Sequence, residues 1–235
     1  MSAGRSAEGA QSPAGPIALL TPMANPTVER EMRALLPPSC DYVVGRLVSR
    51  SGEAEERLRA YATDIASTLK QFGGMPLSAV AFACTGSSYL IGRSGERQVE
   101  KGLEMPIYWA AREIETQLRR LGAKRIAVVS PYPETLHLAG LGYWRDAGFE
   151  IVNDRRVEIG SSDTRQIYAL TGREAELPVA AARRSRPDAI LLSGTGMPSL
   201  ALIDPRGSPP VVSSNWCLAQ AMLAGPAGRQ GPLGD

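Results

Sequence analysis

The sequence is poor in the residues that metal sites and histidine-assisted nucleophiles require. It has one histidine and three cysteines in 235 residues, and it contains no C-x-x-C or H-E-x-x-H pattern. A structural zinc site is built mainly from such ligands, so we expect no bound metal. Three widely spaced cysteines, an odd number, argue against a disulfide framework and favour a reducing compartment, so we expect a cytoplasmic protein.

Long apolar runs and an excess of one charge are also missing. No stretch approaches the roughly 20 apolar residues of a membrane-spanning helix, and the first sixteen residues lack the apolar core of a secretory signal. The net charge is only +2, without the basic stripe of a nucleic-acid binder. We therefore expect neither a membrane nor a nucleic-acid partner. The Ser-, Gly-, Ala- and Pro-rich ends, 1–14 and 225–235, are predicted to be a disordered segment and a flexible tail.

What the sequence does contain is a repeat of apolar runs. Four runs in the first half recur in the second half in the same order and at nearly the same offset. The first set is "IALLTP" (17–22), "DYVV" (41–44), "AVAFACTG" (79–86) and "PIYW" (106–109); the second is "IAVVSP" (126–131), "EIVN" (150–153), "AILLSGTG" (189–196) and "PVVS" (210–213). This repeat predicts two copies of one unit, 15–120 and 121–224.

Amphipathic stretches separate these runs and predict helices. The stretch 53–73 is stopped by two glycines, and 110–125 ends in the same manner at Gly122. Buried apolar strands alternating with helices are typical of right-handed βαβ units. The predicted fold class is therefore α/β, with two pseudo-symmetric Rossmann-like or flavodoxin-like halves. Each half has a parallel sheet flanked by helices, and the active site is expected in the cleft between the halves.

Ligands of such sheets bind beyond the carboxyl ends of the strands. The loops there, 21–27, 83–88, 130–135 and 193–199, supply a thiol, hydroxyls, an amide, a phenol and glycines, but only one ionised side chain, Glu134. They contain neither a Walker loop nor a complete G-x-G-x-x-G, so no nucleotide cofactor is expected. Neutral donors of this kind suit a carboxylate, or the enolate that forms beside one.

Cys84 is the candidate reactive group, because it stands in "ACTGSS" at the end of a buried run. No histidine is available to activate it in the manner of a cysteine protease. Backbone N–H groups or Arg93 would have to stabilise a thiolate. The alternative is a buried free cysteine that acts only as a small apolar residue.

The remaining chemically notable residues are expected to be structural. Cys40 and Cys217 are predicted to pack in the core, and whether Cys217 has any role stays open. His137 lies in a helical stretch and is expected at the surface. Glu29 and Glu31 are interpreted as first-turn residues of the opening helix, where they complement its dipole.

Six segments together resemble successive motifs of the aspartate/glutamate racemase superfamily. They are most similar to the branch of maleate cis-trans isomerases and arylmalonate decarboxylases, and they extend over about 15–224. The segments are "LLTPMANPTVE", "FACTGSSY", "VSPYPETLH", "SSDTRQIYAL", "ILLSGTG" and "PVVSSNWCLAQAML". The resemblance implies two pseudo-symmetric halves, no cofactor, and a small dicarboxylate bound between them.

The resemblance also implies site residues. Racemases and maleate isomerases of this group carry one cysteine at the key strand end of each half; the first matches Cys84, and the second position is Gly194 here. The implied carboxylate and oxyanion ligands are Thr85, Gly86, Tyr132, Thr195, Gly196 and Asn25. Arylmalonate decarboxylases have a serine where this chain has Gly86, and their single cysteine typically occupies the second position.

A single thiol disfavours a two-base racemase, which needs an acid and a base on opposite faces. We expect a cofactor-independent decarboxylase of a malonate-type dicarboxylate, in which Cys84 protonates an enediolate. The alternatives are a maleate isomerase-like enzyme with Cys84 as nucleophile, and a non-catalytic carboxylate-binding protein. The substrate's substituents, the product stereochemistry and the oligomeric state stay open.

Overall fold

The computed structural model describes residues 15–225. It contains two four-stranded parallel sheets, ordered β2-β1-β3-β4 and β6-β5-β7-β8. The strands are β1 (Ile17–Pro22), β2 (Tyr42–Leu47), β3 (Ala79–Phe82), β4 (Ile107–Trp109), β5 (Arg125–Ser130), β6 (Glu150–Arg156), β7 (Ala189–Leu192) and β8 (Val211–Ser213). Each predicted apolar run forms one strand, so the duplicated α/β fold is confirmed. The segment predicted to be disordered, and all of the predicted tail except Gly225, lie outside the described residues.

The two sheets match in register as well as in order. Ile17 of β1 pairs with Ala79 of β3, and Ile126 of β5 pairs with Ala189 of β7. Every residue of β1, β3 and β7 is buried, which explains the continuous apolar runs of these central strands. The division of the chain at 120/121 stays a prediction.

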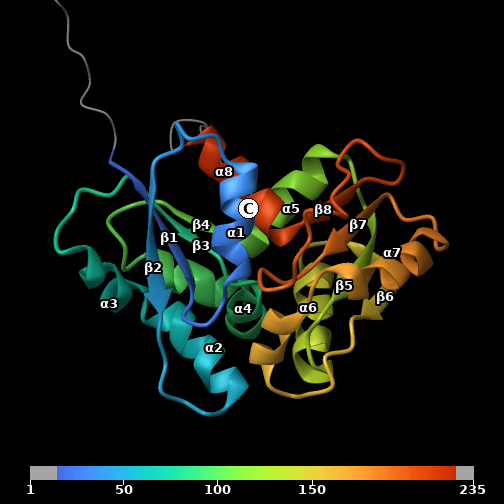
Figure 1. The fold of residues 1–235 in the computed structure, drawn as a ribbon, viewed down its shortest axis with the longest axis horizontal. Helices are drawn as coiled ribbons and strands as arrows, with labels where there is room; N and C mark the ends of the chain where they lie inside the picture. The colour runs from blue at the N-terminus through green and yellow to red at the C-terminus, as the bar shows by residue number, and fades with distance from the viewer. Residues whose placement is uncertain (1–14, 226–235) are drawn as a thin grey trace, which may run out of the picture.

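Helices flank both sheets (Figure 1). They are α1 (Thr27–Leu35), α2 (Ala54–Thr63), α3 (Ile65–Leu69), α4 (Thr85–Glu100), α5 (Ala110–Arg120), α6 (Glu134–Asp146), α7 (Glu176–Arg183) and α8 (Ser214–Ala224), with 3-10 turns at Lys70–Phe72, Thr164–Ala169 and Arg173–Ala175. The amphipathic stretch 53–73 is interrupted at Asp64, and it ends at Gly73, as predicted, in a left-handed conformation that glycine adopts readily. Within residues 15–225 no helix is both long and apolar enough to cross a membrane.

Helix α8 joins the two halves. It follows β8 of the second half, yet it lies beside α1 of the first half in Figure 1. Leu218 and Met222 of α8 pack in one apolar cluster with Val28 and Met32 of α1 and with one face of the first sheet. The two halves therefore share a core, and their relative position is set by packing as well as by the connecting chain.

Glu31 adds a polar link between the halves. It is the fifth residue of α1 and is buried, so its assignment to the first turn was wrong, whereas Glu29 does lie there. Its carboxylate accepts hydrogen bonds from the Ser199 hydroxyl (2.9 Å), the Asn215 amide (2.8 Å) and the backbone N–H groups of Ser199 and Leu200. These bonds anchor the segment after β7 to the first half.

Replacing Glu31 by alanine should lower the free energy of unfolding by about 3 kcal/mol, because several buried donors lose their acceptor. Urea unfolding measures this change. Glu29→Ala is the matched control on the same helix. Its partly exposed ion pair with Arg46 should contribute no more than about 1 kcal/mol. Equal losses in the two variants would contradict the anchoring role.

Candidate active site

The carboxyl ends of β3 and β7 meet between the two halves. Directly after each strand, the backbone continues the ladder to the neighbouring strand in the same way: the Ala83 N–H donates to the Leu20 carbonyl, and the Ser193 N–H donates to the Val129 carbonyl, both at 2.8 Å. The Thr195 hydroxyl then donates to the Ala83 carbonyl at 2.9 Å. The two matched loops of the sequence repeat are thus joined directly, which brings the predicted site residues of both halves together.

Cys84 begins α4 and is 4% exposed. Its sulfur accepts a hydrogen bond from the Ser87 hydroxyl at 3.2 Å and is further stabilised by the N–H groups of Gly86 and Ser87. Burial raises the pKa of the thiol, and these hydrogen bonds oppose the rise only in part. Cys84 is therefore a neutral thiol at neutral pH, a form suited to giving up a proton rather than to nucleophilic attack.

Arg93 does not assist the thiol, contrary to one of the two expectations. Its guanidinium pairs with Glu115 and lies 5.6 Å from the ring centre of Tyr143. It therefore belongs to an ion-pair cluster between α4, α5 and α6. The other expected source, backbone N–H groups, does contact the sulfur of Cys84.

Thr85 and Tyr132 form a pair of hydroxyls across the interface between the halves, 2.7 Å apart. Burial is the main cause that raises the pKa of Tyr132, and the nearby Cys84 raises it further, so the phenol keeps its proton. The pair has two hydroxyl hydrogens, and the bond between them uses one. The other can be donated to a ligand oxygen, as a carboxylate or enediolate requires.

Asn25 and Gly196 are held close to each other by Thr27. The side-chain amide oxygen of Asn25 accepts a hydrogen bond from the Thr27 N–H at 2.9 Å, at the start of α1. The Thr27 hydroxyl donates to the Gly196 carbonyl at 2.8 Å. The bond to Thr27 uses the oxygen of the Asn25 side-chain amide. The NH2 group of the same amide can donate to a carboxylate.

Gly194 lies opposite Tyr132, where the resemblance puts a second cysteine. A Cβ atom added there would lie 3.5 Å from the Tyr132 hydroxyl and 3.1 Å from Cδ of Pro131. The residue has φ +114°, a conformation that other residues rarely adopt. Its N–H donates to Ser214 at 3.0 Å. The left-handed backbone therefore favours glycine over cysteine at this position.

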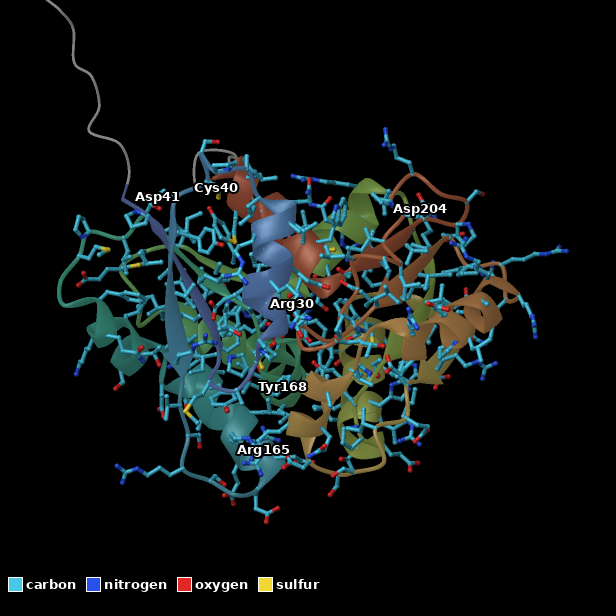
Figure 2. The ribbon with its side chains drawn as sticks, in the orientation of Figure 1. Arg30, Cys40, Asp41, Arg165, Tyr168 and Asp204 are labelled. Carbon is cyan, nitrogen blue, oxygen red and sulfur yellow. The ribbon has the colours of Figure 1, made fainter. Side chains whose placement is uncertain are left out.

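Two tyrosines near Cys84 were missed by the sequence analysis. Tyr61 of α2 and Tyr168 of the 3-10 turn both interact electrostatically with the thiol. Figure 2 shows Tyr168 near the middle of the molecule, between the two halves, and its ring lies against Gly196. Tyr168 lies in one of the family-like segments, "SSDTRQIYAL", but away from a strand end, so the strand-end rule does not identify it.

Two cavities lie next to the site. One of about 530 Å³ is lined by α2, the start of α6 and the segment 162–164, and its wall includes Leu58 and Leu136, whose methyl groups contact Gly86. The other, of about 330 Å³, is lined in part by Thr27. Neither lining includes Cys84, which is buried with 4% exposure.

The structure tests the remaining expectations. Cys217 is fully buried in the core, as predicted, and burial raises the pKa of its thiol. Cys40 is only partly buried at the edge of the core.

His137 is 4% exposed, so its predicted surface position was wrong. Its ring nitrogens contact other residues inside the protein. Among residues 15–225, no group of His, Cys, Asp and Glu side chains could hold a metal ion.

Comparisons with known proteins agree with this architecture. A family model described as arylmalonate decarboxylase matches residues 18–227. The maleate isomerase of Pseudomonas putida KT2440 is 25% identical over 229 residues, which cover 88% of this chain and 90% of the relative.

Solved structures of a maleate isomerase and of an arylmalonate decarboxylase are also similar to this chain. A Nocardia farcinica maleate cis-trans isomerase mutant with a covalently bound succinylcysteine intermediate has a TM-score of 0.72 and 26% identity, covering 90% of this chain and 95% of the other. A liganded arylmalonate decarboxylase, in which a glycine was changed to cysteine and a cysteine to serine, has a TM-score of 0.70 at 19% identity, covering 92% and 94%.

Two matched α/β halves, with neutral donors and a cysteine at their junction, define a member of the aspartate/glutamate racemase superfamily. Within it, the chain belongs to the arylmalonate decarboxylase family, whose model covers nearly all of the described residues. The family model is described as a decarboxylase, whereas the curated relatives, 25% and 26% identical, are maleate isomerases.

Replacing Gly194 by alanine should lower the free energy of unfolding by about 1–3 kcal/mol, because φ +114° is unfavourable for alanine and the added Cβ lies close to Pro131. Gly142→Ala, in α6 with open space around its Cα, should instead raise it by about 0.5–1 kcal/mol. Urea unfolding compares the two. An unchanged free energy of unfolding in Gly194→Ala would show that the left-handed backbone is not required.

Replacing Ser87 by alanine should raise the pKa of Cys84 further, because the Ser87 hydroxyl is the largest of the contacts that lower it. Carbon-13 NMR of labelled cysteine across a pH titration measures the change. Ser94→Ala, at an exposed position that follows the kink of α4 at Gly92, should leave the titration unchanged. A lowered or unchanged pKa in Ser87→Ala would contradict the assigned contact.

Proposed function

We propose that this protein is a cofactor-independent decarboxylase of a malonate-type dicarboxylic acid. The observation that carries the proposal is the asymmetry of the site: one enclosed, neutral thiol, Cys84, and a left-handed glycine, Gly194, at the matching position of the other half. A single proton donor suits a reaction that protonates one face of one carbanion.

The reaction begins with a substrate carboxylate bound by neutral donors. The Thr85–Tyr132 hydroxyl pair, the Asn25 amide and the backbone at Gly196 form this set. The Gly86 N–H, which the resemblance also assigns to it, is directed at the Cys84 sulfur instead. The second carboxylate leaves as CO₂, and the electron pair of the broken C–C bond passes to the retained carboxyl group as an enediolate. The charge that develops on its oxygens is stabilised by the same donors.

Cys84 then completes the reaction. Its S–H bond breaks, the proton passes to the α-carbon, and the thiolate that remains takes a proton from water. The N–H groups of Gly86 and Ser87 and the Ser87 hydroxyl, already directed at the sulfur, stabilise the transient thiolate. Because one thiol serves one face, the product should be a single enantiomer.

Two solved relatives support a role for cysteine in this fold. In the Nocardia farcinica isomerase, a cysteine carries a covalent succinyl group. The liganded arylmalonate decarboxylase variant has gained one cysteine and lost another. Transposing the thiol from the second half to the first would deliver the proton from the opposite face. We therefore propose the product enantiomer opposite to that of a decarboxylase with its cysteine in the second half.

Incubation with phenylmalonate and its α-methyl derivative should release CO₂ and give, from the methylated substrate, one enantiomer of the monoacid. Cys84→Ala should reduce turnover by about 10²–10⁴-fold, the usual contribution of a positioned acid. Gas evolution measures the turnover, and chiral chromatography measures the enantiomer of the product. Cys40→Ala, away from the site, is the matched control.

Equal activity of the wild type and Cys84→Ala would remove the thiol from the mechanism. Thermal stabilisation by phenylmalonate without any turnover would instead support the carboxylate-binding alternative. In that case Tyr132→Phe, but not Cys84→Ala, should reduce the stabilisation.

A maleate isomerase-like activity is the second candidate, because the curated relatives of this chain are maleate isomerases. Cys84 would add to the double bond of maleate as a thiolate, rotation would follow, and elimination would give fumarate. This chemistry requires the ionised sulfur, which burial disfavours here. Proton NMR should show fumarate forming from maleate if the isomerase is correct, and unchanged maleate if it is not.

A further inference from the structure

His137 has two polar partners inside the second half. Its Nδ1 atom lies 2.7 Å from the Ser130 hydroxyl at the end of β5, and its Nε2 atom lies 3.0 Å from an Asp154 carboxylate oxygen on β6. An ionised carboxylate can only accept, so in the neutral imidazole Nε2–H donates to Asp154. Nδ1 then accepts from the Ser130 hydroxyl. The proposed decarboxylation uses none of these three groups.

A serine, a histidine and an aspartate in hydrogen-bond contact suggest a hydrolase triad, but the geometry excludes it. Ser130 is 1% exposed, and its hydroxyl is hydrogen-bonded to Nδ1 of His137 inside the second half. Asp154, by contrast, has a side chain that is 52% exposed. The solvent-exposed end of the Ser130–His137–Asp154 hydrogen-bond chain is therefore the carboxylate, whereas a nucleophilic serine would itself have to be accessible to the substrate.

The hydrogen bonds of His137 instead affect the position of one short loop, because His137 contacts both of its ends. Its ring bonds the Ser130 side chain, and its backbone N–H donates to the Pro133 carbonyl at 2.9 Å. The loop between them, 130–133, carries Tyr132, which hydrogen-bonds to Thr85. It also carries Pro131, whose Cδ would lie 3.1 Å from a Cβ added at Gly194.

We infer that His137, held by Asp154, is a positioning residue that fixes the loop 130–133 and so sets the place of the Tyr132 hydroxyl. The backbone bond belongs to the first turn of α6 and would form with other residues at this position. The ring bond to Ser130 is the specific contribution of histidine. Its loss frees one end of the loop and lets Tyr132 move relative to Thr85. The kinetic consequence rests on the proposed function, whereas the structural consequence does not.

The structural consequence can be measured without a substrate. Fluorotyrosine is incorporated and the fluorine NMR signal of Tyr132 is identified by its loss in Tyr132→Phe. In Ser130→Ala and in His137→Leu this signal should shift or split. Leu138→Ala, an exposed neighbour on α6, should leave it unchanged. An unshifted Tyr132 signal in folded Ser130→Ala and His137→Leu would overturn the inference, whatever the enzyme catalyses.

The kinetic consequence is measured with the substrate that the decarboxylation assay identifies. His137→Leu should lower kcat about tenfold with little change in KM, since a displaced donor weakens transition-state contacts more than binding. His137→Asn, whose amide oxygen can still accept from Ser130, should recover part of the loss.

A double-mutant cycle separates positioning from a general loss of stability. In a Tyr132→Phe background, His137→Leu should have an effect of about twofold or less, because the hydroxyl it positions is gone. Independent, additive effects of the two substitutions would contradict action through Tyr132. If no substrate is turned over, the proposed function fails, and the fluorine signal still decides the positioning role.

Discussion

The site depends on the contact between the strand ends of the two halves, made by the bond from the Thr195 hydroxyl to the Ala83 carbonyl. Neither half contains a complete donor set: Cys84 and Thr85 come from the first half, and Tyr132 comes from the second. The contact is maintained by bonds on either side of it, from Thr27 to Gly196 and from Glu31 to the segment after β7, and by α8, which packs on the first sheet. The same interactions that join the halves thus assemble the site.

A second constraint follows from enclosure. Inside a region of low dielectric, an ionised group without a partner is costly, so Cys84 and Tyr132 keep their protons. Neutral donors remain available for the charge that a substrate brings and for the charge that moves during reaction. The ionised groups nearby, such as Arg93 and Glu115, pair with each other outside the site. The protein therefore separates its structural charges from its chemistry.

The sequence predicts the strands well because central parallel strands are buried on both faces and appear as apolar runs. The repeat of those runs also locates the loops that meet. The helices are less well predicted in detail: the sequence analysis assigned Glu31 to the first turn of its helix and His137 to the surface. Each is buried because a distant segment, 199–215 for one and β5 with β6 for the other, supplies its hydrogen-bond partners.

The sequence by itself determined the duplication, the order of the strands along the chain and the presence of a single thiol opposite a glycine, since these follow from apolar patterning and residue identity. Only the tertiary structure decided that the Cys84 thiol is enclosed and neutral, that Gly194 has a left-handed backbone, and that His137 contacts both ends of the Tyr132 loop. Burial and hydrogen bonding depend on which residues of separate segments meet, and the local pattern of either segment does not contain that information.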